Sequence, residues 1–223
     1  MIADLKKAMK MLKYGYQLKT NIVSAALIMI LGIGCLCIAD ISIAGSSLYL
    51  VGALYFVLGP MFLLQIQTLM LYSHMVKSSP RARFLEIAFG DIFSLVISIV
   101  GYTIIVIYSI IKNNITPDAP FAPWLLATGL LIGVMQIYFS VVYKHFVLGT
   151  GFMLTGIIIV FMTITLLVEV NILGVITLNL TTAIILGYVA VIISLLLCAL
   201  LRRMVYKHSF SKWACGAKLR KEL

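Results

Sequence analysis

Long apolar stretches alternate with short polar gaps along this chain. Each of the six apolar stretches reaches the roughly 20 residues that a helix needs to cross a hydrocarbon layer of about 30 Å. Backbone groups in lipid must find hydrogen-bond partners within the same segment, and the residue-by-residue alternation of a membrane barrel is missing. The pattern therefore predicts an all-α, polytopic membrane protein with six transmembrane helices, at residues 20–39, 48–72, 87–111, 123–143, 147–168 and 180–201.

The composition indicates the same class of protein. Hydrophobic residues make up 63% of the 223 residues, charged residues make up 11%, and the mean hydropathy is +1.15. A soluble domain has about 25% charged and about 45–50% apolar residues, so a soluble fold of this size could not cover so much apolar side chain. No polar gap is long enough for a second domain, and we expect residues 1–223 to form a single transmembrane domain.

Basic residues lie in alternate gaps, and their distribution predicts the orientation of the chain. Of the 17 lysines and arginines, all but Lys112 lie before the first apolar stretch or after the second, fourth and sixth. The acidic residues Asp40, Asp118 and Glu169 lie on the opposite side. Because cytoplasmic loops are rich in lysine and arginine, we expect a multi-pass protein of the plasma membrane with both termini in the cytoplasm. The net charge of +10 then favours anionic lipid, and not nucleic acid, as a partner.

The ends of the chain and the last external gap have patterns of their own. Residues 1–19 carry an apolar stripe at spacings of three and four with lysines beside it, which predicts an amphipathic helix in the cytoplasmic interface. Residues 202–223 are expected to form a basic cytoplasmic tail. Residues 169–179 are too apolar for an ordinary loop and too short to span, so they predict a re-entrant or interfacial segment with breaks at Gly174 and Asn179.

Residues 73–86 form the longest polar gap in the first two-thirds of the chain and include the sequence HMVKSSPRARFLE. Ser79 is well placed as a helix N-cap and Pro80 as the first helical residue, because proline there loses no hydrogen bond. Glu86 follows Arg83 by three residues and is expected to pair with it. This gap is either the capped start of the third span or, as the only internal cytoplasmic gap of this size, a segment that binds a partner.

Ionisable residues are predicted only near the ends of the six spans. Asp91 lies about one turn into the third span, where we expect it to reach Arg81, Arg83 or a lipid headgroup, and Glu169 lies at the external end of the fifth. Carriers driven by ions usually keep an ionisable group deep in the membrane, because a proton or ion must bind there. The pattern therefore favours an energy source outside the membrane.

Uncharged polar residues and glycines within the spans predict contacts with protein. Gln65, Gln67 and Gln136 are costly in lipid, so we expect them to face a protein partner or a transport pathway. Gly129 and Gly133 form a GxxxG pattern, which indicates close helix packing within the chain or in a dimer. The spans contain no paired acids, no serine–histidine pair and no histidine–glutamate metal spacing. We therefore expect no enzymatic activity, and no metal or cofactor bound by this chain.

An amphipathic N-terminal helix, six spans, the segment MVKSSPRARFLE and a partly inserted segment at residues 169–179 together resemble the membrane subunit of ABC-2 type (type V) ABC transporters. Within that family the chain is similar to the membrane subunits of bacterial exporters for phenol-soluble modulins and related amphipathic peptides. The resemblance implies a homodimer, or a dimer with a homologue, that exports such peptides with two separate ATPase subunits. The chain has no GxxxxGK[ST] motif, so ATP and Mg²⁺ would bind to those subunits.

The resemblance also implies roles for particular residues, with residues 1–19 as an elbow helix along the membrane. The residues implied to couple to the ATPase are Ser79, Pro80, Arg81, Arg83, Phe84 and Glu86. Those implied to form the extracellular gate are Glu169, Gly174 and Asn179. The residues alone leave two alternatives open, an ion-coupled carrier or small channel and a membrane scaffold or immunity protein that transports nothing. They do not specify the cargo, and the direction of transport follows from the resemblance alone.

Overall fold

The computed structural model describes residues 18–39, 45–61, 63, 83–115, 121–172 and 178–208. Every regular element in these ranges is a helix, and no strand occurs in them. The prediction of an all-helical chain of membrane character is therefore confirmed for this part of the protein. The predicted features that lie outside the described residues are residues 1–17 of the interfacial helix, Gln65, Gln67, Ser79, Pro80, Arg81, Gly174 and residues 209–223 of the tail.

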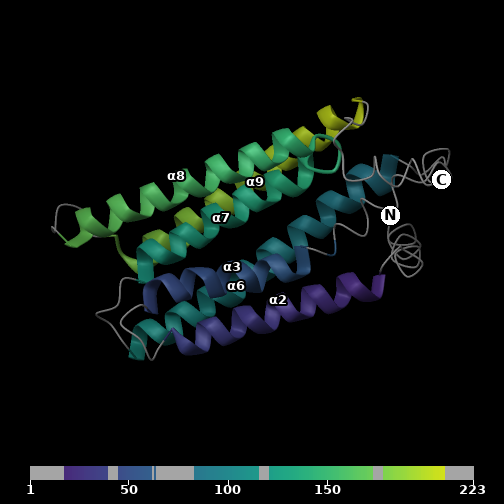
Figure 1. Cartoon of the computed structure of the whole chain (residues 1–223). Helices are drawn as coiled ribbons and strands as arrows, with labels where there is room; N and C mark the ends of the chain where they lie inside the picture. Colours follow the sequence, from purple (N-terminus) through teal and green to yellow (C-terminus); the bar gives the residue numbers. More distant parts are fainter. Residues whose placement is uncertain are drawn as a thin grey trace.

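Successive helices run in opposite directions and form a bundle of two layers, with α7, α8 and α9 in one layer and α2, α3 and α6 in the other (Figure 1). A single π-helical turn, η1, directly precedes α6. The elements are α2 (Leu18–Ile38), α3 (Gly45–Met61), η1 (Phe84–Ala88), α6 (Phe89–Ile115), α7 (Phe121–Val141), α8 (Phe146–Ile172) and α9 (Leu180–Tyr206).

Five of the described helices are long and apolar enough to cross a membrane, namely α2, α6 with the end of η1, α7, α8 and α9. The described part of α3 contributes a shorter apolar helix, Leu48–Met61, where the hydropathy pattern predicts a span at residues 48–72. The predicted continuation of that span lies largely outside the described residues. A sixth span therefore remains a prediction.

Three helices end later than the hydropathy pattern predicts. The ends of α6, α8 and α9 lie at residues 115, 172 and 206 instead of 111, 168 and 201. Arg202 and Arg203 consequently belong to α9 and not to a tail, and Glu169 belongs to α8 and not to a re-entrant segment. The reason is that an apolar stretch ends at its first charged residue, whereas a helix continues wherever that residue reaches a partner or the membrane surface.

Helix α6 is continuous with the widened turn η1, and we refer below to Arg83 and η1 as the start, or first turn, of α6. In η1 the N–H of Phe89 donates to the carbonyl of Phe84, five residues earlier, which is the π-helical pattern. Arg83 has α-helical backbone angles, so the described chain is helical without a break from Arg83 to Ile115. The end of the predicted coupling segment and the third span are thus one rigid element.

Helix α7 lies at the centre of the bundle and contacts α3, α6, α8 and α9. Helix α2 packs against α3. Helices α2 and α8 expose many large apolar side chains, for example Leu31 and Ile159. Such faces are stable against lipid hydrocarbon, which supports a membrane location for the bundle.

Glycines of α7 allow it to approach α9 closely. A Cβ at Gly129 would lie 3.0 Å from the Cα of Gly187, and a Cβ at Gly133 would lie 3.0 Å from the Cβ of Ser194. The GxxxG pattern therefore packs two helices of the same chain. This contact decides between the two kinds of packing, within the chain or in a dimer, that the sequence leaves open.

Candidate functional site

Helix α6 buries a polar face and exposes an apolar one. Asp91, Ser94, Ser98 and Tyr102 follow one another at spacings of three or four, which places them on one side of the helix. Ser94, Ser98 and Tyr102 are buried, and Asp91 is partly buried. Large exposed side chains of the opposite side include Val96, Val100, Ile104, Ile107 and Ile111. This distribution is the reverse of that on a water-soluble helix, and a lipid surrounding favours it.

The buried face of α6 meets polar groups from α7, from the α7–α8 turn and from α9. We call this set of residues the polar seam. Its members are Glu86, Asp91, Ser94, Ser98, Gln136, Lys144, Ser194 and Arg202.

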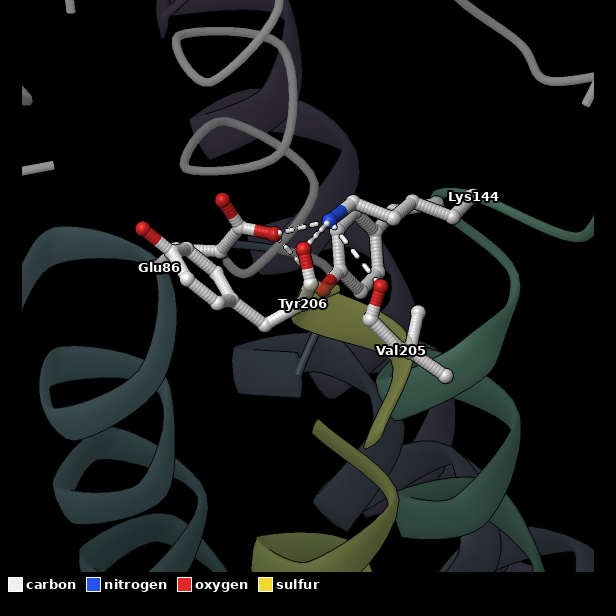
Figure 2. A network of polar contacts seen from close by, with 5 residues as sticks. Glu86, Lys144, Val205 and Tyr206 are labelled. Carbon is white, nitrogen blue, oxygen red and sulfur yellow. Dashed lines mark hydrogen bonds and ion pairs between the residues drawn. The ribbon is translucent and has the colours of Figure 1, made fainter. Parts of the chain in front are cut away.

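Lys144 forms the outermost layer of the polar seam (Figure 2). Its Nζ lies 2.6 Å from Oε1 of Glu86, and it donates hydrogen bonds to the carbonyls of Val205 at 3.1 Å and Tyr206 at 3.0 Å. The hydroxyl of Tyr143 donates to the same carboxylate oxygen at 3.0 Å. Only 3% of the Lys144 side chain and 8% of the Glu86 side chain are exposed. One ammonium group thus joins the start of α6, the α7–α8 turn and the end of α9.

The pairing of Glu86 with Lys144 corrects two expectations. Glu86 was expected to pair with Arg83 and to contact a partner protein, but its carboxylate is buried against Lys144 and Tyr143. Lys144 lies in the gap after the fourth predicted span, as expected from the sequence, but it is buried there against the end of α9. The last carbonyls of a helix lack partners within the helix and carry partial negative charge, which explains why a lysine is stable there.

Arg202 of α9 forms the next layer. Its guanidinium donates to Oδ1 of Asp91 at 2.9 Å and to Oγ of Ser94 at 2.7 Å. Asp91 thus pairs with Arg202, a partner that the sequence did not indicate, while Arg81, one of its predicted partners, lies outside the described residues. The planar guanidinium can serve a carboxylate and a hydroxyl at the same time, which satisfies a charge that would be costly to bury alone.

Gln136 of α7 forms the innermost layer of the polar seam. Its amide nitrogen donates to Oγ of Ser98 on α6, and its amide oxygen accepts from Oγ of Ser194 on α9 at 2.5 Å. The side chain is 1% exposed. Gln136 was expected to face a partner or a pathway, and it bridges three helices of its own chain instead.

Polar contacts continue along α6 toward its far end. The hydroxyls of Thr103 and Tyr188 lie 2.8 Å apart, and those of Ser109 and Tyr49 lie 2.6 Å apart. These uncharged pairs join α6 to α9 and to α3. The ion pairs Glu86–Lys144 and Asp91–Arg202 lie at the end where α6 begins.

The two ends of the described bundle differ in charge. The start of α2, the start of α6, the α7–α8 turn and the end of α9 lie together at one end (Figure 1). The described lysines and arginines of that end are Lys19, Arg83, Lys144, Arg202, Arg203 and Lys207, whereas Lys112 is the described one of the other end. This arrangement agrees with the asymmetry from which the cytoplasmic position of both termini is predicted.

The other predicted site residues are spread over the bundle. Arg83 is exposed and Phe84 is half-buried at the start of α6. Asn179 is exposed directly before α9, and its carbonyl accepts from the N–H of Ala183 and the hydroxyl of Thr182. Glu169 lies in the last turn of α8, at the same end of the bundle as Asn179. Among the described residues, no group of three or more His, Cys, Asp and Glu side chains is arranged to hold a metal ion.

Sequence reasoning missed the polar seam. The available signal was the spacing of Asp91, Ser94 and Ser98, which marks a polar face on an otherwise apolar helix. The partners Ser194 and Arg202 are more than 90 residues away in sequence, so no local pattern connects them to α6.

The groups of the polar seam are mutually paired donors, acceptors and charges, an arrangement suited to holding helices at fixed positions. The chain matches no protein-family model, no curated protein and no solved structure. The function is therefore inferred from the polar seam and from the distribution of charge.

Proposed function

We propose that this chain is the membrane subunit of an ATP-driven exporter of the ABC-2 type, which moves amphipathic peptides out of a bacterial cell. One observation carries the proposal. The described helix from Arg83 onward contains the end of the predicted coupling segment at residues 73–86, and its first turns are tied to the α7–α8 turn and to the end of α9. A force applied to that segment from the cytoplasm reaches three helices at once.

The distribution of ionisable residues supports an external source of energy. In the described helices, every Asp, Glu, Lys, Arg and His lies within the first or last few turns. The two buried ion pairs, Glu86–Lys144 and Asp91–Arg202, are near the charged end and not at mid-depth. A carrier that binds a proton or an ion within the membrane would use a deeper ionisable group.

Burial limits which of the predicted coupling residues are accessible to a partner protein. Arg83 is exposed and Phe84 is half-buried, so both remain candidates for the contact. Glu86 is buried and is reassigned from partner contact to the polar seam. In the proposed assembly, two ATPase subunits bind ATP and Mg²⁺, a second copy of this chain or a homologue completes the pathway, and the residues near Glu169 and Asn179 gate the outer end.

Charge reversal at Arg83 tests the proposal. The chain is reconstituted in liposomes together with the ATPase subunit that the proposal requires, and a synthetic amphipathic helical peptide serves as cargo. We expect Arg83→Glu to reduce ATPase binding and to abolish peptide-stimulated ATP hydrolysis, because an exposed cation of the coupling segment becomes an anion. Lys112→Glu, at the opposite end, is the matched control and should keep both activities. Binding and stimulation that survive Arg83→Glu unchanged would contradict the coupling assignment.

An ion-coupled carrier is the second candidate, and one observation favours it. Asp91 pairs with Arg202 but keeps 25% of its side chain exposed, so a proton or an ion could reach the carboxylate. The two functions differ in liposomes that contain this chain without any ATPase. Proton- or sodium-driven transport that disappears in Asp91→Asn would support the carrier, whereas the exporter is inert under these conditions.

A further inference from the structure

We infer that Lys144 is a positioning residue that makes the first turn of α6 and the last turn of α9 move as one body. The mechanical part of this inference rests on the described geometry alone. Its role in transport rests on the proposed function.

The three donors of the Lys144 ammonium match three acceptors on two other helices. They are the carboxylate of Glu86 at the start of α6 and the carbonyls of Val205 and Tyr206 at the end of α9. Two of these acceptors belong to the backbone, so Lys144 fixes the helix end itself and not only a side chain. A flexible or exposed lysine could not do this, because water would compete for each bond.

The surroundings of Lys144 hold its ammonium in place. The rings of Tyr143 and Tyr206 lie 5.5 Å and 5.3 Å from Nζ, within the range of cation–π attraction. Tyr143 also donates to the same Glu86 oxygen that pairs with Lys144. Two neighbouring residues of the α7–α8 turn, Tyr143 and Lys144, therefore both bind the carboxylate of Glu86.

A second contact between the same two helices lies about one turn deeper. There Arg202 of α9 holds Asp91 and Ser94 of α6. The two layers resist both separation of α6 from α9 and rotation of one helix against the other. A rotation that preserves the contacts of one layer would break the contacts of the other. In both layers α6 supplies the carboxylate, and α9 or the α7–α8 turn supplies the cation.

This geometry has a consequence for the proposed exporter. Arg83 and Phe84, which remain candidates for ATPase contact, lie within one turn of Glu86. When an ATPase displaces the start of α6, Lys144 carries the end of α9 with it. Without Lys144, α6 would move alone and the displacement would not spread through the bundle.

A distance measurement on the full chain tests the mechanical part without any ATPase. Spin labels are attached at Arg83→Cys and Lys207→Cys, both exposed sites, in a chain without its native cysteines in lipid nanodiscs. With Lys144 present we expect one narrow distance distribution. Lys144→Met should broaden or split that distribution, and Lys144→Arg, which keeps a cation and several donors, should largely restore it. Arg203→Met removes an exposed cation from the same end and should change nothing.

Lys144→Met leaves Glu86 buried without its cation, so the variant could fail to fold for that reason alone. The double variant Glu86→Gln with Lys144→Met removes both charges and avoids this cost. A broad distribution in the double variant supports the inference. A distribution as narrow as that of the unsubstituted chain, in either folded variant, overturns it.

Measurements with the ATPase separate this inference from the proposed function. Because Lys144 is buried, we expect Lys144→Met to keep ATPase binding and basal ATP hydrolysis while losing the stimulation by peptide. Failure of the unsubstituted chain to bind any ATPase would end the proposed function but would leave the distance result intact. Full peptide stimulation in Lys144→Met would overturn the role of Lys144 in coupling.

Discussion

Arg202 shows how a single residue changes the interpretation of this sequence. Its charge ends the sixth apolar stretch, so hydropathy assigns it to a tail in the cytoplasm. In the structure it is 4% exposed and holds Asp91 and Ser94. An arginine in this position is stable only while its partners are present, because an isolated buried charge is costly.

Substitution of Arg202 is expected to be destabilising in a way that depends on Asp91. Arg202→Met leaves the partly buried Asp91 carboxylate without its cation and should lower the free energy of unfolding by at most about 3–5 kcal/mol. The loss is smaller to the extent that solvent stabilises the exposed part of Asp91. The double variant Asp91→Asn with Arg202→Met should recover much of the loss. The measurement is thermal unfolding of the protein in detergent.

The neighbouring arginine supplies the matched control for this prediction. Arg203 is exposed, and we expect Arg203→Met to leave the unfolding temperature unchanged. Equal effects of the two single substitutions, or a double variant no more stable than Arg202→Met, would show that the ion pair does not determine the stability of this site.

At the scale of helices, glycines determine how α2 and α3 pack. A Cβ at Gly32 would lie 2.6 Å from the backbone nitrogen of Phe56 and 2.9 Å from the carbonyl oxygen of Gly52. Both are backbone atoms, which cannot move aside as a flexible side chain can. The two helices therefore touch along their backbones, an approach that favours association within a membrane.

Gly32→Ala is expected to force α2 away from α3 and to lower the unfolding temperature. Gly34 lies two residues further along the same helix, and a Cβ there would meet nothing within 4 Å. Gly34→Ala should therefore be neutral, or stabilising by up to about 1 kcal/mol, because alanine favours a helix more than glycine does. Both variants are compared by thermal unfolding in detergent, and equal stability of the two would contradict the close contact.

The existence of the helices could be predicted from the sequence, whereas their ends and neighbours could not. Apolar stretches of sufficient length correctly mark α2, α6, α7, α8 and α9. The end of α9 was predicted too early because Arg202 has a partner that is distant in sequence. The contact of Gly129 with Gly187 was predicted only as a tendency, since a GxxxG pattern indicates a close approach without naming the second helix.

The candidate site could be predicted less well than the fold. Glu86, Asp91 and Gln136 were each noticed, but all three were given other surroundings than those that the structure shows. Their partners are set by helix packing, which hydropathy does not specify. The local rule that pairs charges three residues apart did not predict the partner of Glu86. The tertiary fold instead places the buried cations Lys144 and Arg202 beside the carboxylates of Glu86 and Asp91.

At the scale of the whole molecule, the unequal charge of the two ends predicts how the bundle is inserted. Cytoplasmic segments are enriched in lysine and arginine, so the end with Arg83 and Lys207 is expected to face the cytoplasm and the end with Lys112 the exterior. Single cysteines at these positions, in a chain without its native cysteines, test the orientation with a membrane-impermeant thiol reagent on intact cells.

We expect Lys112→Cys to react on intact cells, and Arg83→Cys and Lys207→Cys to react only after the membrane is opened. All three should react in detergent, which controls for burial of the thiol. Reaction of Lys207→Cys on intact cells would place the end of α9 outside and would contradict the predicted orientation.

The widened turn at Phe84–Ala88 affects how the sequence can gain or lose residues during evolution. A π-helical turn holds one residue more than an α-helical turn, and each residue of an α-helix advances the chain by about 100° and 1.5 Å. Loss of one residue before Glu86 would let this turn close while α6 keeps its place. Because the lost residue is taken up within the turn itself, the chain ahead of it would keep its direction relative to α6. The loss of one residue there would thus leave both the interior and the predicted coupling segment in their present orientation.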